Sequence, residues 1–458
     1  MFINRVFFSS FMNKNRKTII YFSLLVLQVF LARFVYAGAV VLDSLGTVAS
    51  GRGGANISHA DNTAIMHDNP AGLVNMDAGT VIDGMLEFIS TEIKYEDEAG
   101  FDYSKHEIFT LPSVSIAYKK NDDSRFAFGV GAFVTAGFGT EYHQNHSARG
   151  FLPGRQISFG KELYKSDASL TKLLFSVSYK ATDKLSLGVS FGPARHTVNF
   201  ESPYTFQSGL FSGLSAIADM RNNSGLGYSF TTGVQYKLSD KTVVGLSFIS
   251  ESKTTLKGDG NIIIPDTSPL KRLFRNQKGE YDLKTNFEWP REIGFGISHI
   301  LGESHKFAAE LVWFNYSSAY DRADLELTDG NNREFNRLLG PTVNDSFPLN
   351  WENVLAYRFG YEFLLGREMD NVFRFGYVFN ENPIPNSTLV PLIPGTLKHN
   401  FTVGYTHRRG NIDFNIASQF SVADPEFVDN SALVGGDFDN SRLKTKAYLL
   451  LLGITYRL

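Results

Sequence analysis

The stretch "FAFGVGAFVTAGF", residues 126–138, alternates between two kinds of side chain. Its even positions, from Phe126 to Phe138, are apolar and mostly bulky, whereas its odd positions are mostly glycine, alanine or threonine. Because successive side chains of a β-strand point to opposite faces, this pattern predicts a strand with bulky apolar side chains on one face and small side chains on the other. The same period of two recurs in three later segments, 226–238, 355–363 and 412–420.

The lengths of the strands and of their connections favour a membrane barrel over a soluble sandwich. The alternating runs extend over about ten residues, whereas strands of soluble sheets average about 5–6. Short turns, such as 181–184 and 409–410, alternate with long loops, such as 142–167, 201–224 and 322–350. We therefore predict an all-β fold, a transmembrane antiparallel β-barrel of about 14 strands, in which every backbone polar group is satisfied within the sheet. The alternating C-terminal run 447–458 fits a last barrel strand.

Composition agrees with a β-rich chain and excludes several classes of protein. The 458 residues include 40 Phe, 20 Tyr and 41 Gly but no Cys. The net charge of −3 gives no electrostatic basis for binding nucleic acid. After residue 40, no run reaches the roughly 20 apolar residues that a membrane-spanning helix needs.

The N-terminal 78 residues do not alternate and are expected to form two separate units. Residues 1–37 combine a basic start, an apolar run and a small residue at Ala37, which predicts a signal peptide rather than an anchoring helix. Counted from Met12, this signal has an ordinary length, so Met12 is an alternative start. Residues 38–78 are predicted to form a plug, or hatch, inside the lumen, and residues 79–458 the barrel with its long extracellular loops.

The expected plug contains a turn motif and several polar side chains. Asn69 precedes Pro70, and proline restricts the residue before it to extended conformations, which favours a turn. His59, Asp61 and His67 have no spacing specific for a metal, so we assign neither a metal nor a cofactor.

The chain resembles the FadL/TodX-type transporters of long-chain fatty acids and hydrocarbons in Gram-negative outer membranes. The resemblance spans the whole expected mature chain and depends on the order of four segments, "GRGGANISHADNTAIMHDNPAGL" (51–73), "TAGFGTEY" (135–142), "GVQYKLSDKTVVGLSFISESKTTLKG" (233–258) and "NENPIPNSTLVPLIPG" (380–395). It implies that Asn69, Pro70 and Ala71 are the family's plug motif. It also implies a kink in the third strand, for which glycines provide a physical basis, at Gly137, Phe138 and Gly139. The open alternative is that these glycines only make room in the lumen.

The resemblance further implies a transport mechanism and a set of partners. A hydrophobic substrate is captured on apolar extracellular loops, passes to a pocket in the barrel, and leaves sideways through the strand kink after the plug rearranges. The expected partners are fatty acids, hydrocarbons or detergents that mimic them, outer-membrane lipids and the barrel-assembly machinery. The expected state is a monomer in the bacterial outer membrane.

Two loops carry apolar residues that could form the capture groove. Five residues of the first loop recur at or beside helical spacing, and three more follow Ser268-Pro269, a possible helix start, in the second loop. Water-exposed loops rarely carry so many apolar side chains unless they bind something. The alternative is that the two loops bury each other as a lid. The groove residues are Phe206, Leu210, Phe211, Leu214, Ile217, Leu270, Leu273 and Phe274.

Four arginines are candidate partners for a substrate carboxylate. A carboxylate buried in an apolar pocket needs a cationic or hydrogen-bonding partner. By alternation Arg358 and Arg374 face the lumen, while Arg322 and Arg195 lie at strand ends. The alternative for the two lumen-facing arginines is a structural ion pair with Glu362 or Asp413. A neutral hydrocarbon would require no such residue.

The competing functions are an outer-membrane lipid hydrolase and a passive porin or adhesin. A hydrolase would need a serine, a histidine such as His399 or His407, and an acid near the rim. The sequence contains no nucleophile elbow, phosphate-binding loop or zinc-protease motif. We therefore predict a transporter and not an enzyme.

Overall fold

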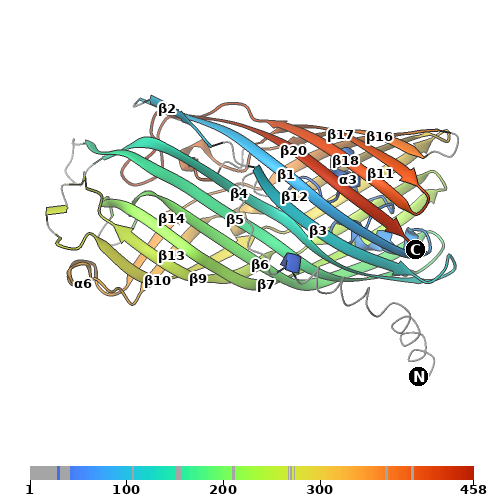
Figure 1. Cartoon of the computed structure of the whole chain (residues 1–458), viewed down its shortest axis with the longest axis horizontal. Helices are drawn as coiled ribbons and strands as arrows, with labels where there is room; N and C mark the ends of the chain where they lie inside the picture. Colours follow the sequence, from blue (N-terminus) through green and yellow to red (C-terminus); the bar gives the residue numbers. More distant parts are fainter. Residues whose placement is uncertain are drawn as a thin grey trace, which may run out of the picture.

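β-Strands make up most of the chain and wrap into one elongated barrel (Figure 1). The computed structural model describes residues 28–30, 42–98, 100–105, 108–149, 156–208, 212–266, 268, 271–272, 274–366, 370–393 and 397–458. The expected signal peptide, 1–37, lies outside these residues apart from 28–30. No helix among the described residues is long and apolar enough to cross a membrane.

The strands and helices have the following bounds. The strands are β1 Gly79–Asp97, β2 Gly100–Tyr103, β3 Ile108–Lys119, β4 Phe126–Arg149, β5 Gln156–Lys180, β6 Leu185–Thr205, β7 Ser215–Ser239, β8 Thr242–Ile249, β9 Ser252–Ile263, β10 Lys278–Trp289, β11 Glu292–Leu301, β12 His305–Phe314, β13 Arg322–Thr328, β14 Val343–Pro348, β15 Val354–Leu365, β16 Asn371–Asn380, β17 His399–Arg409, β18 Ile412–Val422, β19 Glu426–Val428 and β20 Ser441–Arg457. The helices are α3 Thr47–Gly51, α4 Ile65–Asp68, η1 Pro70–Asn75, α5 Tyr316–Ala319, α6 Arg333–Leu339 and η4 Asn386–Thr388.

Antiparallel pairing closes the sheet on itself. β1 pairs with β20 from Val81↔Arg457 to Glu96↔Arg442, so the first and last strands are neighbours. Several barrel strands are interrupted and consist of two segments, namely β2/β3, β8/β9, β10/β11, β12/β13, β14/β15 and β18/β19. Counted across these interruptions, the described part of the sheet is a barrel of 14 antiparallel strands, which confirms the predicted fold class.

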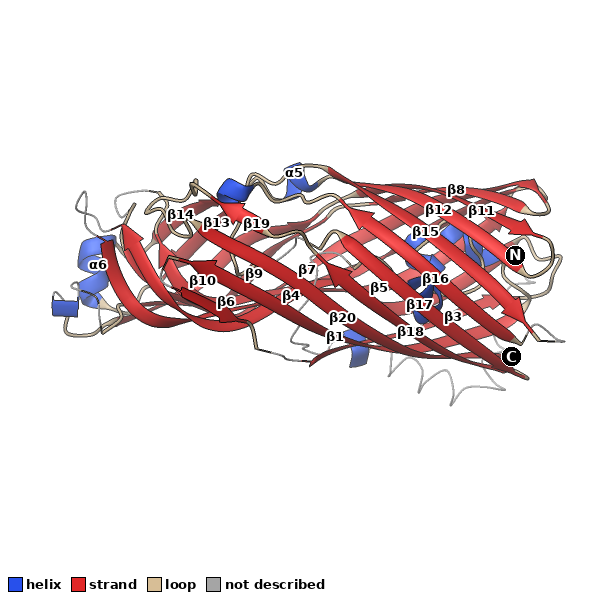
Figure 2. Cartoon of the chain, turned by 90° about the horizontal axis from the view of Figure 1, so that it is seen from above, coloured by secondary structure: helices blue, strands red, loops and turns tan. Residues whose placement is uncertain are grey.

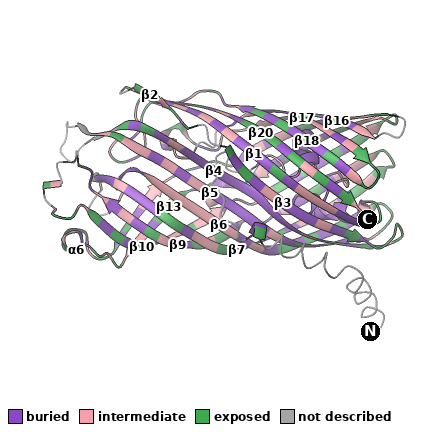
Figure 3. Cartoon of the chain, viewed as in Figure 1, coloured by how far each residue is buried: buried purple, intermediate pink, exposed green. Residues whose placement is uncertain are grey.

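Alternating exposure identifies the lipid-facing side of the wall (Figure 3). Phe126 and Phe128 are each 50% exposed, whereas Ala127 between them is buried. The same alternation continues at the C-terminus, where Leu450 and Leu452 are exposed and Leu451 is buried. The period of two in the sequence therefore separates an apolar outer belt from a lumen filled by smaller and polar side chains.

The strands from β4 to β7 extend much further than expected. Pairing of β4 with β5 continues to Arg149↔Gln156, and pairing of β6 with β7 continues to Thr205↔Ser215. The predicted loops 142–167 and 201–224 are therefore mostly strand, and the helical interpretation of 201–224 was wrong. The physical reason is that the two halves of each segment satisfy their backbone groups by pairing with each other.

The long strands build an extension on the long-loop side of the barrel. β6, β7, β9, β10, β13 and β14 enclose a separate apolar cluster that includes Tyr204 and Phe335. Within this outer extension, Asp345 of β14 joins β14 to the end of β6. Its carboxylate accepts hydrogen bonds from the Tyr204 hydroxyl at 2.7 Å and from the backbone N–H of Ser208 at 2.7 Å.

Residues 42–78, called here the inner segment, carry the short helices α3, α4 and η1 inside the barrel. Figure 2 shows these helices behind the strands of the wall near the short-turn end. All five residues of α3 are buried, and η1 contacts β5, β6 and β7. The inner segment thus occupies the lumen at this level.

Candidate functional site

The Asn69-Pro70-Ala71 motif joins the inner segment to the barrel wall. Asn69 is completely buried, and its side-chain amide donates to the carbonyls of Ile57 at 2.8 Å and Val234 at 3.1 Å. Its side-chain oxygen accepts from the Ala71 N–H at 3.2 Å and so caps η1, in which Pro70 takes the first position. The motif is therefore a helix cap that also binds strand β7.

Glycines in the wall provide the space for this motif. A Cβ added at Gly233 would collide with the side chain of Asn69, and one added at Gly188 would collide with the backbone of Pro70 and Ala71. The inner segment and the wall consequently approach each other at backbone distance, which fixes the position of η1 along β6 and β7.

A buried charge network holds the other end of the inner segment. The Arg52 guanidinium lies 2.7 Å from Asp61 and 3.1 Å from Glu362 of β15, and Arg374 of β16 lies 2.9 Å from the same Glu362. His59 lies 3.4 Å from Glu362. Burial, together with the nearby cations, lowers the pKa of His59 to about 3, so its ring is neutral at physiological pH.

The wall arginines make structural ion pairs. Arg358 and Arg374 are both buried and face inward as predicted. Arg374 pairs with Glu362, and Arg358 lies 3.7 Å from Glu310, which also accepts the Ile57 N–H. The alternative of structural pairing therefore describes both residues, although Arg358 uses a different acid from the one expected.

The other two candidate arginines do not face the lumen. Arg322 begins β13 with a side chain that is 63% exposed and lies 3.3 Å from Asp324. Arg195 is half-buried beside His196, whose buried ring points inward to the Ser252 hydroxyl at 2.8 Å. Because neighbouring strand residues face opposite sides, Arg195 points away from the lumen.

A cluster of aromatic side chains fills the barrel on the long-loop side of the inner segment. The rings of Tyr320 and Trp351 stack at 4.6 Å between centroids, and Tyr316 lies 5.5 Å from Trp351. Ile57 of the inner segment belongs to the same group of packed residues. We call this group the central apolar cluster; its larger members include Phe138, Leu170, Trp289, Tyr316, Tyr320 and Trp351.

The ladder between β3 and β4 stops beside this cluster. β3 pairs with β4 only from Val114↔Ala132 to Lys119↔Ala127, although both strands continue beyond Val114 and Ala132. Just past that point β4 carries a bulge at Thr135, whose carbonyl accepts the backbone N–H of Leu42 at 3.4 Å. The strands are joined again where Lys105 N–H donates to the Glu141 carbonyl at 2.8 Å.

This interruption lies close to the predicted kink. Gly137, Phe138 and Gly139 pair regularly with β5, so the irregularity lies at Thr135 instead, two residues before Gly137. Phe138 is buried and belongs to the central apolar cluster. Pro112 of β3 lies two residues before Val114, the last residue paired with β4, and has no N–H to donate, which gives a physical reason for the lost pairing.

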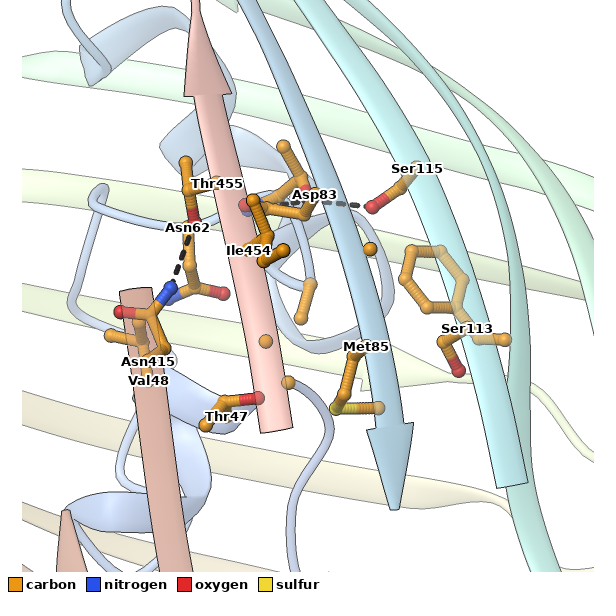
Figure 4. A pocket seen from close by; sticks show the side chains of 16 residues that line it. Thr47, Val48, Asn62, Asp83, Met85, Ser113, Ser115, Asn415, Ile454 and Thr455 are labelled. Carbon is orange, nitrogen blue, oxygen red and sulfur yellow. Dashed lines mark hydrogen bonds between the residues drawn. The ribbon is translucent and has the colours of Figure 1, made fainter. Parts of the chain in front are cut away.

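Next to the β1–β20 seam, a small cavity of about 30 Å³ lies between the inner segment and the wall (Figure 4). Asp83 of β1 accepts hydrogen bonds from the backbone N–H of Thr63 at 2.9 Å and from its hydroxyl. The Thr63 hydroxyl also lies 2.5 Å from the hydroxyl of Ser115 on β3. A space of this volume holds one or two water molecules, and a hydrocarbon does not fit.

The comparison with known families decides the class of protein. The profile of a family described as outer membrane protein transport protein (OMPP1/FadL/TodX) matches residues 28–458. The chain belongs to the OMPP1/FadL/TodX family. An outer membrane protein of Neisseria meningitidis serogroup B, NMB0088, is 21% identical over 386 residues, covering 78% of this chain and 80% of its own length.

Solved structures agree on the fold of this family member. The Pseudomonas putida toluene transporter TodX superimposes with a TM-score of 0.74 at 19% identity, over 92% of this chain and 100% of that chain. A Pseudomonas aeruginosa FadL homologue gives 0.73 at 17% identity over 92% and 100%. The Ralstonia pickettii toluene transporter TbuX gives 0.69 at 19% identity over 91% and 99%.

In this FadL/TodX-family chain the predicted groove residues lie in the outer extension. Phe206 is buried there, and Leu214 and Phe274 pack against the same cluster, with Phe274 4.8 Å from the ring of Phe335. Ile217 lies in β7, paired with Ile263. Leu210, Phe211, Leu270 and Leu273 lie outside the described residues.

Sequence reasoning missed the inward-facing lysines, among them Lys172 of β5. Its side chain is buried between the central apolar cluster and the inner segment, and its Nζ lies 3.3 Å from Nε2 of His67. The signal was present, because Lys172 shares an inward face with Leu174 and Ser176, where the other strands mostly carry small or neutral residues. Within the described residues, His59, Asp61 and His67 do not converge as metal ligands.

Proposed function

We propose that this chain carries hydrophobic small molecules inward across the outer membrane and releases them sideways between β3 and β4. The observation that supports this route is the position of the central apolar cluster, which reaches Phe138 directly beside the interrupted ladder. The inner segment acts as the plug of residues 38–78, because it fills the lumen below the cluster. A substrate entering the cluster thus has an apolar path to the bilayer and no aqueous path to the periplasm.

Capture from outside involves the outer extension. Its apolar core lies around Phe206 and Phe274, so the two loops bury each other as a lid over a hydrophobic interior. Substrate binds here first, when the hydrogen bonds that the Asp345 carboxylate accepts from Tyr204 and Ser208 break and the lid opens. It then passes to the central apolar cluster. The chain acts as a monomer, inserted by the barrel-assembly machinery through β20.

The bulge at Thr135 provides the direct test of the lateral route. Val134 pairs with Thr171 and Ala136 with Leu170, so Thr135 is an extra residue, and its deletion leaves both flanking registers unchanged. We expect the deletion to abolish substrate uptake in a strain lacking the native gene while the barrel still folds. Thr135→Ala keeps the bulge and serves as the control. Normal uptake by the deletion variant would refute lateral release at this position.

The substrate is a neutral hydrocarbon or a long-chain fatty acid. The similar structures described as toluene transporters favour the first, whereas Lys172 offers a cation for the carboxylate of the second. The four predicted arginines do not serve this role, since two are paired in the wall and two face away from the lumen. Lys172→Met should lower uptake of labelled oleate at least tenfold and leave toluene uptake unchanged if the acid is carried. Equal uptake of oleate by both proteins would exclude Lys172 as the partner of the carboxylate, and toluene uptake without oleate uptake by the wild type would assign the chain to neutral hydrocarbons.

We also infer that the chain is a transporter and neither an enzyme nor an open porin. His399 faces the Tyr377 hydroxyl at 2.8 Å, and His407 faces Asn371 at 3.1 Å, so these ring nitrogens are not directed at a serine. Purified protein should release no fatty acid from phospholipid vesicles. Because the inner segment fills the lumen, the same protein should show no steady ion conductance in planar bilayers.

A further inference from the structure

A row of charged side chains faces outward just beyond the lipid-facing belt on β1 and β20. On β20, Tyr448 is the last exposed apolar position of the belt, and the next outward positions towards the long-loop end are all basic. The facing positions of β1 are acidic, basic and acidic in turn. We call these residues the β1–β20 patch: Glu92, Lys94 and Glu96 on β1, with Arg442, Lys444 and Lys446 on β20.

The register of the two strands places one pair of like charges between two pairs of opposite charge, Glu92 with Lys446 and Glu96 with Arg442. Lys94 lies directly across from Lys444 in the ladder, an arrangement that destabilises a sheet unless an anion joins the two ammonium groups. The carboxylates of the patch are already engaged, since Lys94 lies 2.7 Å from Glu96 and Lys446 lies 3.5 Å from Glu92. Within the described residues, the side chain of Lys444 has no hydrogen-bond or ion-pair partner.

The depth of these cations matches that of lipid headgroups. A strand rises about 3.3 Å per residue and tilts about 40° in a membrane barrel, so Lys446 lies about 5 Å and Lys444 about 10 Å beyond Tyr448. The polar region of a bilayer is about 5–7 Å thick on each side, and flexible lysines reach a few ångströms further. A cavity of about 270 Å³ opens between the patch residues and Tyr103. Lys446 and Lys444 therefore lie within reach of the headgroups of the outer leaflet, and Arg442 lies farther out.

Another outward lysine near the end of the belt shows how the wall balances charge elsewhere. Lys253 of β9 lies directly across from Glu288 of β10, and their charged groups are 3.0 Å apart. This arrangement is an ordinary cross-strand pair of opposite charges. The excess of cations on β1 and β20 is thus not a requirement of the barrel wall, and it calls for an anion from outside the chain.

We propose that the β1–β20 patch binds the phosphorylated sugar headgroup of an outer-leaflet glycolipid, lipopolysaccharide. A phosphate placed between Lys94 and Lys444 would relieve their repulsion through charge-assisted hydrogen bonds. The hairpin β1–β2 adds exposed aromatic rings at the same site, Phe101 at 65% and Tyr103 at 47% exposure, which offer flat surfaces for a sugar ring. A glycolipid fits both features, whereas a phospholipid uses only the cations. The inference does not depend on the transport route proposed above.

Binding of labelled lipopolysaccharide to the purified barrel in detergent tests the proposal. Three ligands are compared, namely lipopolysaccharide, the same material after phosphatase treatment, and phosphatidylglycerol. We expect dephosphorylation to weaken binding at least tenfold and phosphatidylglycerol to bind at least tenfold more weakly than lipopolysaccharide. Equal binding after dephosphorylation would overturn the phosphate contact, and equal binding of phosphatidylglycerol would overturn the assignment to a glycolipid.

Variants locate the site on the barrel. Lys94→Ala/Lys444→Ala should lose at least tenfold in affinity, and Lys444→Glu at least as much. The second variant reproduces the balanced arrangement seen at Lys253, so its folding, checked by heat-modifiable migration in gels, is not at risk. Lys253→Ala removes an outward lysine from a balanced pair and should bind within twofold of the wild type. Unchanged affinity in folded Lys444→Glu protein would refute the site.

Discussion

Replacing Asn69 by alanine should release the inner segment from the wall without disturbing the barrel. The substitution removes a helix cap, for which losses of about 0.5–2 kcal/mol are typical. It also leaves the buried carbonyls of Ile57 and Val234 without the amide that they accept at 2.8 and 3.1 Å. Each such bond contributes about 0.5–1.5 kcal/mol, and more when a buried group is orphaned. The combined loss of about 2–4 kcal/mol favours undocking roughly 30- to 800-fold.

Conductance and uptake together measure this change. In planar bilayers, Asn69→Ala should show transient ion-conducting openings that the wild type lacks. Uptake of dilute substrate per folded molecule should fall, because the inner segment no longer closes the lumen below the central apolar cluster. Asn75→Ala is a graded control, because Asn75 lies at the other end of η1, is itself only partly buried, and bonds to the side chains of Gln235 at 2.9 Å and Ser186 at 3.1 Å instead of to backbone carbonyls. Closed channels with normal uptake in Asn69→Ala would refute the docking role of the motif, and so would failure of the barrel to fold.

Three further predictions concern a wall glycine beside the motif, the buried charge network and the long loop 429–440. Gly233→Ala should reproduce the conductance of the cap variant, because its new methyl group occupies the place of the motif asparagine, whereas Gly84→Ala, with nothing within 4 Å of the new atom, should behave as the wild type. Glu362→Gln removes the carboxylate shared by two buried arginines and should destabilise the protein by about 3–5 kcal/mol, seen as a lower thermal midpoint; an unchanged midpoint would contradict the network. Burial raises the pKa of Asp437, in the long loop 429–440, to about 7, so docking of this loop is strongest when the carboxyl is protonated and weakens as pH rises from about 4 to 7. Hydrogen exchange of the loop, corrected for intrinsic rates, should show less protection at pH 8 than at pH 5, and Asp437→Asn should remove the difference.

The strands of the barrel wall were predictable because the alternation of side chains that defines them lies within each short segment of sequence. Alternation alone placed Arg358 and Arg374 on the inner face, and the structure finds both there. Glu362 lies directly across from Arg374 in the ladder, so the ion pair follows once β15 and β16 are neighbours. Alternation could not exclude Arg322, because that residue lies where β12 and β13 are interrupted by α5 and the periodicity is broken.

The contacts of the inner segment and of the outer extension required long-range information. Glu310 accepts the N–H of Ile57 across 253 positions of sequence, and no local pattern relates the two. Phe206 and Ile217 fit a helical spacing when read as one segment, yet they lie on either side of the turn between β6 and β7. The bulge at Thr135 depends on the register with β5, although Pro112 carried a local signal that the neighbouring ladder ends.

The inner segment is held by polar contacts and by apolar contacts, and this difference explains how a hydrophobic substrate could displace part of it. A ligand shifts an equilibrium only by the difference between its affinities for the two states. An apolar molecule gains little from the charge network at Arg52, so it cannot act there. It can act on the apolar contacts of the inner segment, and those nearest the interrupted ladder are made by Ile57 in the central apolar cluster and by Leu42, which donates to Thr135 beside Phe138. Opening should therefore begin at the Leu42 end, next to the interrupted ladder, while Arg52 and Asn69 keep the rest of the inner segment docked. A disulfide joining Leu42→Cys to Thr135→Cys should then block uptake fully, and its reduction should restore it; uptake that continues in the oxidised variant would place the opening elsewhere.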